Sequence, residues 1–488
     1  MTFMTRLAFA LMLLAGTVGA SSAADRPPNF IVILVDDLGW RDVGFMGNPF
    51  VETPHIDRLA KAGIVFTQAY SSAPNCAPTR ACLMAGQYTP RHGVYTVVDP
   101  RQPAGSPWHR LVAAHSESEL ATEVVTLPEA LKPGGYATGF FGMWNLGRGR
   151  NGPRTPSGQG FDTVVFPENL GFGKDAYFDG QGNYLSDRLT DEVLSFMATN
   201  RSRPFFVYLA DHAVHAPFDP KPALLAKYER KARGASDRRD DPAYAATIEA
   251  VDESVGRIVD GLSDLGLGDD TFVIFTSDNG GTQQYTAPLN GSKGQLYEGG
   301  IRVPLVVTGP SIKNVGSMSD MPVASIDIYP TLLELAGLTP PPDQILDGVS
   351  WAGILRGSPP PKRQRMFWHF PCYVGKATPS SAVREGDLKL IEFFEDGGRV
   401  ELYNLRDDPG ETRNLAAALP SKAQALSAAL RGWQKETNAA VPRDANPAYD
   451  PQSDRPRGGQ GERAGAGGNQ PKAKPGGNRD KNRKRKAP

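Results

Sequence analysis

A cysteine near the start of a predicted helix stands out among the residues whose types and spacing suit chemistry. Cys76 lies two residues before Pro78 and four before Arg80. Proline suits the first helical turn because its φ is already helical and its missing N–H would have no partner there. We therefore expect Cys76 just ahead of a helix that ends near Gly86. Oxygen anions forming beside Cys76 would face unpaired backbone N–H groups, so this position is suited to handling anions.

Acidic and amide side chains form a second set of candidates. Asp36 and Asp37 follow one apolar run, and Asp278 and Asn279 follow another. Adjacent carboxylates raise each other's pKa unless a cation neutralises them. Carboxylate and amide oxygens suit a hard divalent cation such as calcium or magnesium. Each pair alone also fits a helix cap or a turn, and the Cys76 motif beside them favours the metal.

These residues need a scaffold that brings them together, and the sequence predicts an α/β fold. Residues 29–35 are apolar and rich in β-branched side chains, as in a strand buried on both faces of a mostly parallel sheet. Residues 53–63 are typical of a helix, with Thr53 as its cap and Gly63 at its end. The same alternation predicts helices at 127–131 and 244–265 and strands at 137–141, 205–210, 272–276 and 304–308.

Polar residues follow three of the predicted strands. They are Asp36 with Asp37, His212 with His215, and Asp278 with Asn279. Open α/β sheets place their sites in loops beyond the carboxyl ends of the strands. We therefore expect these three groups to meet at one rim of the sheet.

Changes in composition divide the chain into four parts. Residues 1–24 have Arg6, an apolar run and then small residues, which is the layout of an export signal, and the run is shorter than the roughly 20 residues of a membrane span. Residues 25–357 form the predicted catalytic domain. Residues 358–440 predict a smaller α+β domain with a hairpin of 388–394 and 400–404 and a helix at 421–437. Residues 441–488 have few apolar side chains and are predicted to be disordered. We expect an exported protein, periplasmic or extracellular, with no membrane span.

The charges and cysteines exclude some partners and some sources of stability. The chain has 53 basic and 53 acidic residues, so its overall charge indicates no nucleic-acid partner. Residues 454–488 hold 11 basic and three acidic residues. They are either a solvated tail or a contact for polyanions. Three cysteines are too few for a disulfide framework, and a bridge from Cys76 to Cys82 has unsuitable geometry across a helix start.

The run from Cys76 to Arg80, followed by Leu83, Ala85 and Gly86, resembles the signature of the type I sulfatases. In that family a maturation enzyme oxidises the cysteine to formylglycine. The resemblance covers about residues 28–415. It implies an alkaline-phosphatase-like α/β fold, with a large mixed, mostly parallel sheet flanked by helices and a smaller C-terminal α+β domain containing an antiparallel sheet. It also implies hydrolysis of a sulfate ester, with sulfated carbohydrate weakly favoured.

The resemblance also assigns roles to residues of this chain. A calcium ion would be held by Asp36, Asp37, Cys76, Asp278 and Asn279. The hydrated aldehyde of modified Cys76 would attack sulfur with one hydroxyl, and its other hydroxyl would then expel sulfate. Arg80 would support the nucleophile, His215 would protonate the leaving alcohol, and His212 is a much weaker candidate. The predicted substrate-binding residues are Lys293, Asn145 and His369.

One block departs from the family pattern. The family usually has lysine and histidine where this chain has Met143 and Asn145, and Cys372 also stands where many relatives have histidine. The family's lysine binds sulfate, and its histidine is the base for sulfate elimination. Asparagine cannot act as a base near neutral pH, and losing a general base lowers rates by about 10² to 10⁴.

Three interpretations follow from that departure. The chain is a divergent sulfatase, a phosphonate or phosphate ester hydrolase of the same superfamily, or a binding protein that holds sulfated glycans without turnover. The retained nucleophile and metal motifs favour the sulfatase.

Overall fold

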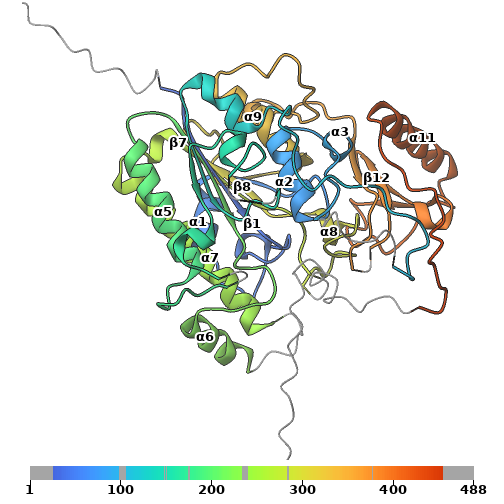
Figure 1. Ribbon diagram of the computed structural model, residues 1–488, viewed down its shortest axis with the longest axis horizontal. Coiled ribbons are helices and arrows are strands. Elements are labelled where there is room, and N and C mark those ends of the chain that lie inside the picture. The colour runs from blue at the N-terminus through green and yellow to red at the C-terminus, as the bar shows by residue number, and fades with distance from the viewer. Residues whose placement is uncertain are drawn as a thin grey trace, which may run out of the picture.

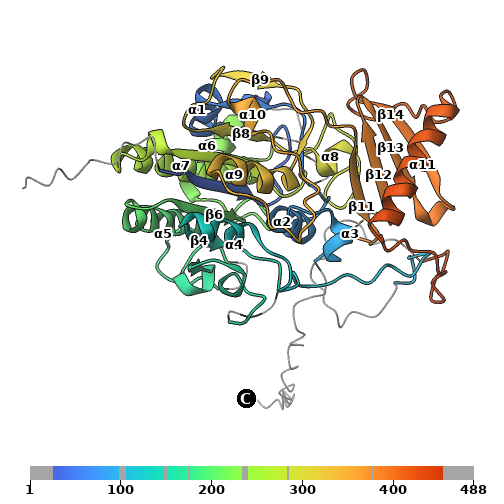
Figure 2. The same ribbon diagram turned by 90° about the horizontal axis from the view of Figure 1, so that it is seen from above.

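The computed structural model describes residues 26–97, 106–147, 149, 151–173, 176–233, 240–282, 285–375 and 377–453. A layered α/β part and a smaller sheet lie side by side (Figures 1 and 2). The predicted export signal at 1–24 and the basic segment at 454–488 lie outside the described residues. Within the described ranges, no helix combines the length and the apolar character needed to cross a membrane.

The large sheet has eight strands in the order β5-β4-β6-β1-β7-β8-β2-β9. The five strands from β5 to β7 are parallel neighbours, and β8 is antiparallel to both β7 and β2. The predicted mixed, mostly parallel sheet is therefore confirmed. The strands are β1 (Asn29–Val35), β2 (Ile64–Phe66), β4 (Ala137–Gly142), β5 (Thr163–Val165), β6 (Phe205–Asp211), β7 (Thr271–Ser277), β8 (Leu305–Thr308) and β9 (Ser317–Ser319). Two short strands, β3 (Ala69–Tyr70) and β10 (Val323–Ala324), pair separately.

The position of β1 between two hydrophobic cores explains why its sequence is apolar throughout. Ile31, Ile33 and Val35 point into one hydrophobic core, and the alternate residues point into the other. Burying a large aliphatic side chain contributes about 1.5 to 3 kcal/mol, so both faces of the strand hold helices. The first core includes α1 (Pro54–Ala62), α5 (Leu185–Asn200), α6 (Pro222–Ala232) and α7 (Pro242–Asp264), and α6 packs on α7. The second includes α2 (Cys76–Ala85), α4 (Leu127–Leu131), α9 (Ile328–Ala336) and α10 (Ala352–Leu355) (Figure 1).

The smaller sheet is antiparallel and lies at one end of the molecule (Figure 2). Its strands are β11 (Met366–Phe370), β12 (Ser380–Glu385), β13 (Leu388–Phe393) and β14 (Arg399–Asn404), and α11 (Pro420–Glu436) packs on it. The predicted hairpin is β13 with β14, and Gly397 and Gly398 at its turn have φ of 68° and 81°. Left-handed φ at both positions explains the two glycines. Two short helices, α3 (Thr89–His92) and α8 (Glu298–Ile301), lie between the two parts.

Three local predictions need correction. Helix α2 begins at Cys76 itself, with Asn75 as its N-cap. The Thr53 side chain does not cap α1, because its hydroxyl bonds with Asp57 and with the Gly44 N–H. Residues 441–453, predicted to be disordered, are held by Asn446, which is buried and donates to the carbonyls of Ser106 and His109. Polar bonding therefore orders this segment despite its few apolar residues.

Candidate active site

The polar groups that follow β1, β6 and β7 meet at the carboxyl ends of these neighbouring strands. Ligand atoms of Asp36, Cys76 and Asp278 all lie within 4.8 Å of one another, as do those of Asp36, Asp37 and His215. The order β6-β1-β7 explains this, because parallel neighbours end at the same edge. Helix α2 adds Cys76 from the second core. The structure thus brings together residues that are up to about 240 positions apart in the sequence.

Arg80 is the cation at the centre of this group. Its Nη2 lies 2.9 Å from Asp36 Oδ2 and 2.7 Å from Asp278 Oδ2, and all three side chains have no exposed surface. The same guanidinium donates to the Met143 carbonyl. Buried charges are tolerated only when they are paired and hydrogen-bonded. Arg80 therefore holds both strand ends in place.

One arginine does not neutralise two carboxylates. Burial and the neighbouring Asp36 raise the pKa of Asp278 to about 7. For Asp36 the effect of burial is outweighed by Arg80 and nearby cationic groups, which lower its pKa. A further cation at this place would let both carboxylates ionise.

Two buried oxygens indicate where such a cation fits. Asp36 Oδ1 and Asn279 Oδ1 have no hydrogen-bond partner in the described part of the chain. The Asn279 amide donates to Asp37 Oδ1 at 2.7 Å, which leaves its own oxygen free of a donor. A buried acceptor without a partner costs about 1 to 3 kcal/mol. Carboxylate and amide oxygens in this arrangement fit a hard divalent cation.

Cys76 is the first residue of α2 and is nearly inaccessible, with 4 % of its surface exposed. Its Sγ lies 3.6 Å from Asn75 Oδ1. Burial, together with the charges of Asp36 and Asp278, raises the pKa of the Cys76 thiol. The reactive form of cysteine is the thiolate, so an unmodified thiol here is a poor nucleophile near neutral pH.

Lys293 and His215 both lie against Asp37, with His215 Nε2 3.6 Å from Asp37 Oδ2. Lys293 Nζ is 3.0 Å from both oxygens of Asp37 and 3.2 Å from His215 Nε2. His215 Nδ1 lies 2.7 Å from the Ala216 carbonyl, which can only accept, so Nδ1 donates. In this arrangement Nε2 accepts from Lys293. The Tyr177 hydroxyl donates to the His215 carbonyl at 2.6 Å and fixes that backbone.

Sequence and structure comparisons find similar proteins over most of this chain. Residues 28–338 match the sulfatase family, and residues 292–436 match the C-terminal part described for N-sulphoglucosamine sulphohydrolase. This chain belongs to the type I sulfatase family. A sulfatase of Formosa agariphila is 33 % identical over 85 % of this chain and 90 % of its own length. The N-acetylgalactosamine-6-sulfatase of Homo sapiens is 34 % identical over 86 % of this chain and 88 % of its own. The crystal structure of Ps i-CgsB in complex with k-i-k-neocarrahexaose covers 84 % of this chain and 94 % of its own, with 27 % identity and a TM-score of 0.70.

Membership of this family supports hydrolysis of a sulfate ester as the activity of this chain. The large mixed sheet and the small antiparallel sheet are the architecture that the resemblance implies. The roles of individual residues depend on the geometry of this chain.

The other two predicted substrate-binding residues, His369 and Asn145, have surroundings unlike those of Lys293. His369 is buried in β11, where its ring nitrogens are 2.6 Å from Ser381 Oγ and 3.1 Å from the Ala440 carbonyl. Both nitrogens are thus used in the packing of the small domain, and a contact of His369 with substrate stays a prediction. Asn145 has a left-handed φ of 56° and is half-buried. Its side chain makes no hydrogen bond within the described residues.

His212 is close to the group but differs in character from His215. It is buried, and burial lowers its pKa to about 4. Its Nδ1 has no partner among the described residues, and its ring packs against Tyr177. His212 is therefore a neutral ring at physiological pH.

Asp42 supports the site, and sequence reasoning missed it. Asp42 Oδ2 accepts from the Gly39 N–H at 2.7 Å and from the Tyr244 hydroxyl at 2.5 Å, and burial raises its pKa to about 6. These bonds tie the loop after β1 to α7. The sequence carries no signal for this link, because Tyr244 is about 200 residues away and belongs to no motif.

Proposed function

We propose that this sulfatase removes sulfate from a sulfated carbohydrate, using formylglycine made from Cys76 and one bound calcium ion. The observation that carries the proposal is the convergence of Cys76, Asp36 and Asp278 within 4.8 Å around the buried Arg80. The two unpartnered oxygens of Asp36 and Asn279 support the calcium. The raised pKa of the Cys76 thiol supports a requirement for a modified side chain.

Each group has a part that its position suits. Calcium would be held by Asp36, Asp37, Asp278, Asn279 and the residue at 76, and it would supply positive charge to the sulfate oxygens. Formylglycine would supply the hydroxyl that attacks sulfur. Lys293 lies beside Asp37 and can donate to a sulfate oxygen as negative charge develops there.

His215 is the proposed proton donor for the leaving alcohol. Its side chain is 26 % exposed, so a substrate oxygen can reach it from solvent. In the arrangement described above Nε2 carries no proton, so donation from it requires that Lys293 release its hydrogen bond and that Nε2 first take up a proton from solvent. A sulfate that takes the Lys293 ammonium as its partner would bring about this release.

The carbohydrate substrate is inferred from relatives. The human relative is named for N-acetylgalactosamine-6-sulfate, and the compared crystal structure holds a neocarrahexaose. Both are described by their names as acting on or binding saccharides. We extend that class, and no particular sugar, to this chain.

A binding protein without turnover is the second candidate. Asn145 cannot take a proton near neutral pH, and Met143 brings no charge to the site. The backbone carbonyl of Met143 accepts a hydrogen bond from Arg80, so the segment with Met143 and Asn145 still lies against the site. One experiment, a measurement of sulfate release, separates the sulfatase from the binding protein.

Sulfate release tests the proposal directly. The full chain, co-expressed with a formylglycine-generating enzyme, is incubated with a panel of sulfated glycans, an aryl sulfate, and phosphonate and phosphate esters, and the free sulfate, phosphonate or phosphate is measured. Mass spectrometry of the Cys76 peptide shows whether the aldehyde formed. We expect release that stops with EDTA, returns with calcium and is absent in Cys76→Ala. Tight glycan retention by matured protein without any product would establish the binder, and turnover of phosphonate or phosphate esters alone would establish the other hydrolase.

A further inference from the structure

Asp42 closes the loop that carries two of the proposed metal ligands, Asp36 and Asp37. Its side chain is buried, and its Oδ2 accepts from the Gly39 N–H at 2.7 Å and from the Tyr244 hydroxyl at 2.5 Å. The Gly39 carbonyl accepts in turn from the Asp42 N–H at 3.1 Å. The turn after β1 is therefore bonded to itself and anchored to α7.

Two glycines bring this turn against the loop after β7. A Cβ on Gly281 would lie 3.3 Å from the Gly39 Cα and 3.4 Å from Asp42 Oδ2. A Cβ on Gly39 would lie 2.5 Å from the same oxygen, which is closer than real Cβ atoms approach. Asp42 thus occupies the space where the two loops meet. Gly281 is two residues beyond Asn279, another proposed metal ligand.

Lys293 is attached to both loops. Its N–H donates to the Gly281 carbonyl at 3.1 Å, and its Nζ lies 3.0 Å from the Asp37 carboxylate. Asp42 lies next to Gly281 and closes the turn that follows Asp37. The position of the Asp42 carboxylate therefore affects both the backbone and the ammonium of Lys293.

Tyr244 is the residue of α7 that reaches this turn. Its ring is buried and stacks on Tyr285, with centroids 4.0 Å apart and planes 16° from parallel. The Tyr285 hydroxyl donates to Asp241 Oδ2 at 2.8 Å, and Asp241 also accepts from the Tyr244 N–H as the N-cap of α7. These contacts fix the Tyr244 hydroxyl relative to the start of the helix. That hydroxyl lies 3.5 Å from the Asp37 carbonyl as well as beside Asp42.

Asp42 bonds with a loop N–H and with the Tyr244 hydroxyl, so its effect on a bound metal would pass through the neighbouring ligands. Partners that lie behind metal ligands orient them, and losing one lowers metal affinity by about 10- to 100-fold. A loop that is free to move must also be ordered when the ion binds, and that ordering lowers the affinity. Asp42 and Tyr244 hold the loop with Asp37 before any ion arrives.

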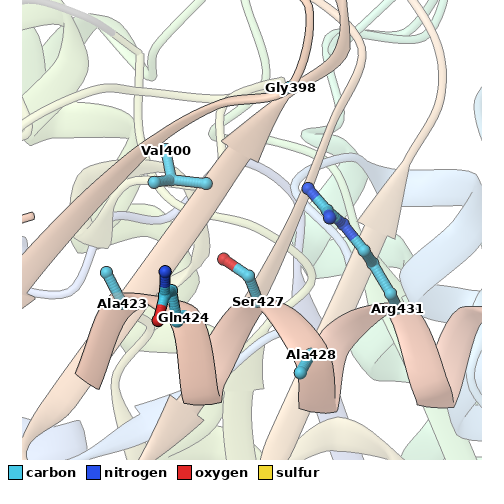
Figure 3. A pocket seen from close by; sticks show the side chains of 7 residues that line it. All are labelled: Gly398, Val400, Ala423, Gln424, Ser427, Ala428 and Arg431. Carbon is cyan, nitrogen blue, oxygen red and sulfur yellow. The ribbon is translucent and has the colours of Figure 1, made fainter. Parts of the chain in front are cut away.

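A groove on α11 in the small domain is a weaker candidate for a role in function. It has a volume of 280 Å³, and small side chains such as Ala423 and Ala428 line it (Figure 3). Its arginine, Arg431, pairs with Glu392 at 2.9 Å, so the charge of this arginine is already balanced. The buried group around Asp42, in contrast, lies against the loops of the proposed metal ligands.

We propose that Asp42 and Tyr244 are positioning residues for the metal, which set the place of Asp37 and of the loop with Asn279 before the ion binds. This role rests on the calcium ion of the proposed function and adds residues that lie outside the ligand set. Without the Tyr244 hydroxyl, Asp42 loses its link to α7, and the turn with Asp37 gains freedom. Calcium binding then weakens although every ligand is still present.

Calcium titration of the full chain by isothermal calorimetry, after chelation and dialysis, tests this role without any turnover. Tyr244→Phe removes one hydroxyl, keeps the ring on Tyr285 and changes no charge. We expect its calcium dissociation constant to rise at least about tenfold. Tyr136→Phe is the matched control, because Tyr136 is equally buried and its hydroxyl donates to the Pro28 carbonyl at 2.8 Å. Both residues directly precede parallel strands, β4 and β1, at the opposite edge of the sheet, so this control should leave the calcium affinity unchanged.

Asp42→Asn is the second variant, because it keeps the shape of the side chain and weakens both of its hydrogen bonds. It should also weaken calcium binding, and added calcium should restore sulfate release by both variants toward that of the parent. Unchanged calcium affinity in either variant, an equal loss in Tyr136→Phe, or a lost sulfate release that calcium does not restore would overturn the positioning role. A parent that binds no calcium would overturn this role together with the calcium of the proposed function. Weakened calcium binding by both variants of a parent that releases no sulfate would support the role and refute the proposed hydrolysis alone.

Discussion

Charge balance around two buried carboxylates determines the chemistry at the scale of single residues. Asp36 and Asp278 share one guanidinium, while Asp37 takes the ammonium of Lys293 and the amide of Asn279. Each charged side chain in the group therefore affects the protonation state of its neighbours. Single substitutions here should act mainly on catalysis where the residue faces substrate, and on folding where it is fully enclosed.

For Lys293 we expect the effect on catalysis to be larger than the effect on folding. Lys293→Met keeps the length of the side chain and removes its charge and its donors. Removing one donor that stabilises developing negative charge lowers kcat by about 10² to 10³. We expect that loss in sulfate release on the best substrate, together with a lower urea unfolding midpoint, because Asp37 loses its paired ammonium. Lys61→Met, at an exposed site on α1, is the matched control, and an equal loss there would contradict the assignment.

At the scale of elements, α2 carries the nucleophile and needs a defined end. Gly86 follows it with φ of 65°, and its N–H bonds to the Cys82 carbonyl at 2.8 Å. A Cβ at Gly86 would lie 2.8 Å from Leu346 Cδ2 and 3.0 Å from Tyr329 Cγ. The glycine is therefore required both for its left-handed backbone and for close packing against α9.

Two glycine substitutions separate these requirements. Gly337 ends α9 with φ of 69°, and a Cβ there would meet nothing within 4 Å. Gly337→Ala should cost about 1 kcal/mol for the left-handed conformation. Gly86→Ala should cost about 1 to 3 kcal/mol more, because the added methyl group overpacks the core. Urea unfolding of both variants measures the difference. Equal losses would show that α9 shifts to accommodate the methyl group without lowering the free energy of unfolding.

At the scale of the whole molecule, a buried ionic group joins the two parts. Lys389 of β13 lies 2.9 Å from Glu298 of α8 and 2.9 Å from Glu411, and none of these three side chains is exposed beyond 3 %. Tyr70 donates to Glu298 at 2.8 Å and accepts from Arg384. The small sheet is thus fixed to the helix that follows the Lys293 loop.

This group predicts a pH dependence of folding. Burial, outweighing Lys389 and reinforced by Glu298, raises the pKa of Glu411 from 4.5 to about 7. The folded state then holds the proton more tightly than the unfolded state, so the contribution of Glu411 to stability is greatest below pH 4.5. It is lost as pH rises through the window from 4.5 to 7.

Glu411→Gln removes that titration. Relative to the parent, the unfolding free energy of the variant should rise between pH 4.5 and 7 by on the order of 2 to 3 kcal/mol and level off above pH 7. Urea unfolding at a series of pH values measures this difference. Glu385→Gln, at a half-exposed ion pair, should show no such rise. A flat difference for Glu411→Gln would mean that Glu411 ionises normally in the folded protein.

How much could be predicted from the sequence differs between elements and contacts. Strands such as β1 and β7 and helices such as α7 follow from apolar runs and their period, because these patterns act over a few residues. The extra order at 441–453 could not be predicted, because it depends on the carbonyls of Ser106 and His109 more than 300 residues away. The link between Asp42 and Tyr244 is of the same kind.

The sequence by itself determined the strand and helix pattern, the polar residues at three strand ends and the motif around Cys76, since each of these is written in neighbouring residues. Only the tertiary structure decided that Arg80 pairs with both Asp36 and Asp278, that both ring nitrogens of His369 bond within the small domain, and that Asp42 links the loop after β1 to α7. Such contacts join side chains from distant segments, and the order of strands in the sheet settles which of them meet.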